Sequence, residues 1–192
     1  MTRIFPSLAS LSLMLTMAAM GLGLVVGDLY ASPPVEAVLQ SRGRHMLTGV
    51  AAMLAVVFVE CIVVTYFIGT SRWCKEVTET YGLPREDLAE SQRLKRRTFP
   101  WCVLGMLTVV AVGALGAAAD PGTGRQNTAA MADIHLAASL AGLAIIAWTY
   151  YRAWLAMAAN QGVIERIVAQ VQRIRVERGL DEPQSPAVGI QV

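Results

Sequence analysis

Long apolar stretches separated by short polar ones dominate the pattern of this chain. Four of them have about 20 residues or more, the helical length that crosses a hydrocarbon layer of about 30 Å. They cover residues 7–27, 46–69, 100–119 and 134–158. The sequence therefore predicts an all-α integral membrane protein whose four transmembrane helices form an up-down bundle.

The first apolar stretch also resembles a secretory signal, because it follows a basic residue, Arg3, near the start of the chain. Signal cleavage prefers small residues, and Leu29-Tyr30-Ala31 places a large side chain at the corresponding site. We therefore expect an uncleaved first helix. Cleavage as a signal peptide is the alternative.

A polar, basic stretch, residues 70–99, separates the second and third spans and is predicted to be a cytoplasmic loop. Within it, Leu83-Pro84-Arg85-Glu86-Asp87 is typical of a helix start with acidic residues in its first turn. Pro100 predicts a new start for the third transmembrane helix, because proline is tolerated in a first turn. Ser32-Pro33-Pro34 likewise predicts a helix that begins before the second span.

The segment after the fourth span has apolar residues at steps of three and four, which predicts an amphipathic cytoplasmic helix over about 160–178. Such a helix fits three roles: lying on the inner leaflet, pairing with a second copy, or docking a partner. Residues 179–192 read as a disordered tail. Residues 1–178 are accordingly expected to form a single domain.

The distribution of basic residues predicts the orientation. Thirteen of the 16 Lys and Arg fall on the side of residues 70–99 and of both termini. Short basic loops stay in the cytoplasm, so both termini are expected there, in a multi-pass protein of the inner membrane. A formal net charge of +2, a hydrophobic content of 55% and a mean hydropathy of +0.48 argue for a lipid bilayer and against nucleic acid as the partner.

Motifs of soluble enzymes are missing from the sequence, which contains no P-loop, GxSxG, HExxH or dinucleotide fingerprint. The three cysteines, Cys61, Cys74 and Cys102, have no ligand spacing and make no complete disulfide set. We therefore expect no catalytic activity of the chain's own.

Two histidines, His45 and His135, sit at matching depth at the outer ends of the second and fourth spans. Imidazoles from neighbouring helices can hold a haem b iron as axial ligands, and Arg42 and Arg44 are placed to contact its propionates. The plain alternative is two polar residues where water begins. A proton or metal role at the outer face is a third reading.

Glu60 lies inside the second span, where a charge costs about 2.5–3.5 kcal/mol on insertion scales. Arg152 of the fourth span differs from it in depth by only about 3 Å when both are counted from the histidines. The sequence therefore predicts an intramembrane Glu60–Arg152 ion pair. The alternatives are a protonatable Glu60 in a proton path and a Glu60 that snorkels to the inner surface.

These features favour a small polytopic membrane protein that is a non-catalytic subunit or anchor of a larger complex. Its partners would be other membrane subunits or a cytoplasmic protein, bound through 70–99 and 160–178. The first alternative is a b-type haem electron-transfer protein using His45 and His135. The second is a small transporter or proton-conducting subunit using Glu60.

Overall fold

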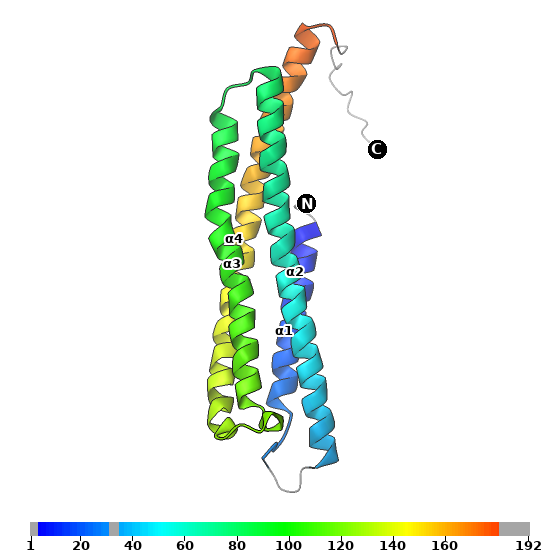
Figure 1. The fold of residues 1–192 in the computed structure, drawn as a ribbon. Coiled ribbons are helices and arrows are strands. Elements are labelled where there is room, and N and C mark those ends of the chain that lie inside the picture. The colour runs from blue at the N-terminus through cyan, green and yellow to red at the C-terminus, as the bar shows by residue number, and fades with distance from the viewer. Residues whose placement is uncertain (1–3, 31–34, 181–192) are drawn as a thin grey trace, which may run out of the picture.

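Helices account for nearly all of the fold in the computed structural model, which describes residues 4–30 and 35–180 (Figure 1). The elements are α1 (Ile4–Leu24), α2 (Glu36–Tyr81), α3 (Glu86–Ala119), the short 3-10 helix η1 (Pro121–Thr123) and α4 (Thr128–Glu177). No strand occurs within these described ranges. The expected all-helical fold is therefore confirmed.

Each of the four α-helices is long and apolar enough to cross a membrane. Large apolar side chains also point away from the protein interior, among them Leu11, Leu54, Phe58 and Leu107. An outward apolar surface of this kind is stable against lipid tails rather than against water. The coarse expectation of a protein with four membrane-capable helices thus holds.

The helices form a long bundle in which α3 packs against both α2 and α4, while α1 packs mainly against α2 (Figure 1). Helix α1 covers only one half of the bundle's length. We call the end where α1 leads into α2, and α3 into α4, the histidine end. The opposite end, where α2, α3 and α4 continue without α1, is called the extension.

The extension replaces the loop that was predicted over residues 70–99. This stretch consists of the last part of α2, a tight turn, and the first part of α3. Gly82 ends α2 with φ 66°, and its N–H donates to the Thr78 carbonyl. Glycine reaches this left-handed conformation without a steric penalty. The predicted helix start after Pro84 is confirmed, because α3 begins at Glu86.

The predicted amphipathic helix is the continuous end of α4. Its apolar residues Val163 and Ile167 are buried against Cys74 of α2 and Leu83 of the turn between α2 and α3. Its Arg166 donates hydrogen bonds of 2.7 Å to Asp87 and to Glu90 of α3. The apolar face is therefore covered within the chain itself, while most of the predicted tail, 181–192, lies outside the described residues.

Pro100 lies inside α3 rather than at its start. Thr98, Cys102 and Gly105 are buried on one face that continues past this proline, whose own side is exposed. Tertiary packing therefore carries the helix through a residue that favours a helix start. The start predicted at Ser32-Pro33-Pro34 falls almost entirely outside the described residues, and α2 begins at Glu36.

Candidate functional site

The only two histidines of the chain meet inside the histidine end of the bundle. His45 comes from α2 and His135 from α4, and their ring centroids are 6.2 Å apart with an angle of 70° between the ring planes. These two helices make few contacts with each other, while each packs extensively against α3. The matching depth expected from the sequence thus corresponds to real proximity.

The ring of His45 is fixed by α1. Its Nδ1 lies 2.9 Å from the carbonyl oxygen of Ala19, and an acceptor at that position requires a proton on Nδ1. The Nε2 lone pair is then free. Gly23 brings the α1 backbone so close that an added Cβ would lie 2.9 Å from the His45 Cε1.

The ring of His135 is packed in the same way against α3. A Cβ at Gly116 would lie 3.0 Å from the His135 Cε1. The Nδ1 of His135 is buried and has no hydrogen-bond partner among the residues that the structure describes. Buried polar atoms are rarely left without a partner, and this nitrogen is one that can accept a hydrogen bond or bind a ligand.

The distance between the two rings fits a shared metal ion. A bond from a metal ion to an imidazole nitrogen is about 2 Å long, and the ring centroid lies about 1 Å behind that nitrogen. Two rings that hold one ion from opposite sides therefore have centroids about 6 Å apart. The observed 6.2 Å agrees with this spacing.

The two arginines near His45 differ in their contacts. Arg42 donates two hydrogen bonds to Asp120 at the end of α3, and Arg44 is exposed. The guanidinium of Arg42 holds the pKa of the Asp120 carboxyl below its usual value. Arg42 thus already has a carboxylate partner within the chain.

A second polar site surrounds Glu60 near the middle of the bundle. Its side chain is fully buried, and its Oε1 accepts a hydrogen bond of 2.8 Å from the Thr149 hydroxyl on α4. A Cβ at Gly105 of α3 would lie 2.5 Å from the same oxygen. The other oxygen, Oε2, has no hydrogen-bond partner in the described part of the chain.

Arg152 does not reach Glu60, so the predicted ion pair is not formed among the described residues. Its guanidinium lies over the ring of Trp101, 5.0 Å from the centroid, and 5.8 Å from that of Trp148. Thr149, three residues before Arg152 on α4, occupies the position opposite Glu60. A cation over an aromatic face gains electrostatic stabilisation, which gives Arg152 another partner.

A hydrogen-bonded cluster near the extension escaped the sequence reasoning. Asn160 of α4 is fully buried, accepts from the Ser91 hydroxyl at 2.8 Å, and donates to Tyr66 and Thr70 of α2. It joins three helices. The only signal in the sequence is an asparagine among apolar residues, which does not reveal its partners.

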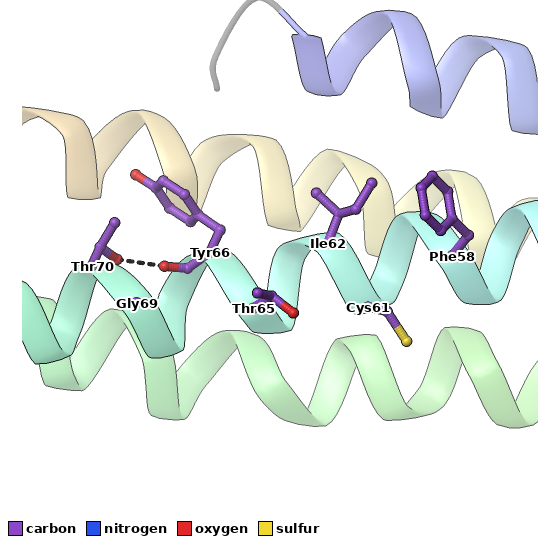
Figure 2. A pocket seen from close by; sticks show the side chains of 7 residues that line it. All are labelled: Phe58, Cys61, Ile62, Thr65, Tyr66, Gly69 and Thr70. Atoms are coloured by element: carbon purple, nitrogen blue, oxygen red, sulfur yellow. Dashed lines mark hydrogen bonds between the residues drawn. The ribbon is translucent and has the colours of Figure 1, made fainter.

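A groove of about 460 Å³ runs along α2 beside this cluster (Figure 2). Its lining residues all come from this one helix and are Phe58, Cys61, Ile62, Thr65, Tyr66, Gly69 and Thr70. Figure 2 shows the Thr70 hydroxyl turned back to the Tyr66 carbonyl, at 2.8 Å. The lining carries no charged side chain, so we assign it no ligand.

Clusters of three or more His, Cys, Asp or Glu that would hold a bare metal ion do not occur in the described residues. The cysteines are free, with Cys61 exposed and Cys74 and Cys102 buried.

No protein-family model matches the chain, and no curated protein or solved structure is significantly similar to it. Within the described residues, the histidine pair and the Glu60 site are the two candidate functional sites.

Proposed function

We propose that this chain is a b-type haem-binding electron-transfer protein of the membrane, with His45 and His135 as axial ligands. The observation that carries the proposal is the 6.2 Å between the two ring centroids, which suits an iron ion held between them. Bound haem supplies the chemistry, since its iron accepts and returns one electron. The chain supplies the two ligands and fixes their orientation.

The number of ligands favours haem over a bare metal ion. Protein zinc sites use three or four side chains, and the described residues around the histidines do not provide a third. A porphyrin brings four nitrogens of its own, so two imidazoles complete the coordination of its iron. A pair of histidines without further ligands is thus sufficient for haem and insufficient for zinc.

The surroundings of the two rings support the same proposal. The Nδ1 of His45 is held by the Ala19 carbonyl, the kind of outer contact that orients a metal-binding imidazole. Gly23 and Gly116 leave the other two helices without side chains beside the rings. Backbone that lacks Cβ atoms lets α1 and α3 pack directly against the two rings, which fixes their orientation.

The orientation in the membrane is part of the proposal. With thirteen of 16 Lys and Arg toward the extension and the termini, we place both termini in the cytoplasm of a cell with an inner membrane. The histidine end then faces outward. Because Arg42 is engaged by Asp120, the exposed Arg44 is the better contact for an outward propionate.

Absorption spectroscopy of the detergent-purified protein tests the haem directly, before and after reduction with dithionite. We expect Soret and α bands in the natural chain and their loss in His45→Ala and in His135→Ala. Asp133→Ala is the matched control, because Asp133 is exposed two residues before His135 and should retain both bands. A folded protein without these bands, even after haemin is added, contradicts the proposal.

A second candidate function, a membrane anchor for a cytoplasmic partner, is supported by the extension. Its outward side carries exposed basic residues, including Arg72, Lys75 and Arg93, on a helical frame. Native electrophoresis of solubilised membranes tests it. An anchor should migrate in a larger complex, and reversing the charge of Arg72 and Arg93 should release it. Migration at its own size in the source membrane contradicts anchoring.

A further inference from the structure

We infer that Glu60 is a proton-binding site in the middle of the bundle, and that its carboxyl is protonated at neutral pH. The inference does not depend on haem. It rests on the burial of the side chain, on the hydrogen bonding of its two oxygens, and on the charged and titratable groups near it.

The carboxyl group has too few partners to be ionised. It has no exposed surface, one oxygen accepts a hydrogen bond from the Thr149 hydroxyl, and the other has no N–H or O–H partner within the described chain. The Cys102 thiol beside the carboxyl is only a weak donor. A buried carboxylate is stable only when a cation or several hydrogen bonds compensate its charge. A proton on the carboxyl removes that charge and provides a donor.

Among the described residues, no positively charged side chain forms an ion pair with Glu60. The titratable neighbours are Cys102 of α3 and Tyr150 of α4, and Cys61 follows it on α2. Helix α1, Ile4–Leu24, contains no ionisable side chain. The nearest candidate cation, Arg152, lies over tryptophan rings instead.

A metal cation does not fit this place. Hard cations take six or more oxygen ligands, or keep several water molecules. The described residues around the carboxyl provide one hydroxyl, that of Thr149, which also lies 2.9 Å from the Ile146 carbonyl. One proton removes the charge of the carboxyl without requiring any further ligand.

Gly105 shows that the space is shaped for a carboxyl group. Any Cβ at this position of α3 would lie 2.5 Å from Glu60 Oε1 and 3.2 Å from the Thr149 hydroxyl oxygen. The carboxyl therefore lies directly against the α3 backbone, and three helices contribute to one site. Removing the proton would place a bare charge at their junction, so proton release requires these helices to separate or admit water.

Infrared spectroscopy at neutral pH tests the inference, because ordinary carboxyl groups are ionised there. The natural chain should show the C=O band of a carboxylic acid, which should shift in D₂O. Glu60→Gln should lose the band, while Asp133→Asn, which changes an exposed carboxyl, should retain it. Absence of the band in the folded natural chain, or its persistence in Glu60→Gln, overturns the inference.

Three further measurements test the inference even if Glu60→Gln does not fold. Thr149→Val removes the donor to Oε1, so the C=O band should move to higher frequency; an unchanged band means that it belongs to another group. Replacing potassium by sodium at constant pH should leave the band unchanged, and its loss would assign the site to a metal cation. The double variant His45→Ala/His135→Ala should retain the band, which separates this inference from the haem proposal.

Discussion

Arg42 of α2 holds Asp120 at the end of α3 through two hydrogen bonds, Nε to Oδ1 at 2.8 Å and Nη2 to Oδ2 at 2.6 Å. The pair is partly buried, with side-chain exposures of 28% and 13%. Asp120 also accepts from the Gly122 N–H, which shapes the turn toward α4. One carboxylate thus ties three parts of the histidine end together.

This pair should make stability depend on acid pH. Because Arg42 lowers the pKa of Asp120 in the folded protein, the stabilisation is present above the unfolded pKa and is lost as pH falls through the folded pKa. We expect Asp120→Asn to lower the free energy of unfolding by about 1 kcal/mol at pH 7, and to make that free energy less dependent on acid pH. Unfolding in detergent at pH 7 and pH 4 measures both. If Asp133→Asn, which changes an exposed carboxyl, lowers stability equally, the prediction is wrong.

Gly116 should tolerate no side chain. Alanine there would meet the His135 ring at 3.0 Å, and we expect a loss of about 1–3 kcal/mol, typical of overpacking. Gly21→Ala is the control of opposite sign, because no atom lies within 4 Å of an added Cβ and alanine favours the helix by about 1 kcal/mol. Thermal unfolding of the two variants compares them. Equal stability would count against the close packing of α3 on His135.

In the hydrogen-bonded cluster near the extension, we expect substitution of Asn160 to lower stability most. Asn160→Ala leaves the Ser91, Tyr66 and Thr70 hydroxyls without this partner, and an unsatisfied buried group costs about 1–3 kcal/mol. Gln161→Ala, the exposed neighbour, should change stability by less than about 0.5 kcal/mol. Chemical unfolding of both variants gives the difference. Similar values would mean that the cluster does not hold the helices together.

Exchanging the charges of Glu60 and Arg152 should not restore stability. The two residues have separate partners, Thr149 and the tryptophan rings, so the variant Glu60→Arg/Arg152→Glu should be at least as unstable as the worse single variant. Thermal unfolding of the three variants measures this coupling. Rescue in the double variant would show that the residues interact after all.

Much of the fold could be predicted because lipid imposes a simple rule on sequence. An apolar stretch of sufficient length must be helical, since its backbone groups find no water. The extension was harder, because residues 70–99 are polar and their helical state depends on packing against α4 through contacts such as that of Arg166 with Asp87. The helix start predicted at Pro100 was wrong for the same reason, because tertiary packing outweighs the local preference of proline for a first turn.

The candidate sites could be predicted only in part. Counting residues gives depth in a bundle, and depth correctly suggested that His45 and His135 lie at one level. It does not give the direction in which a side chain leaves its helix. Glu60 and Arg152 have similar depth, yet one faces Thr149 and the other Trp101.

Helix α4 runs unbroken for 50 residues, from beside the histidine pair to the tip of the extension. At 1.5 Å per residue it is about 75 Å long, more than twice the thickness of a hydrocarbon layer. In a rigid rod of this length, a tilt of about 5° at one end displaces the other end by about 6.5 Å. A change in packing around His135 would therefore shift Arg166 and its neighbours, which lie about 45 Å further along the same helix.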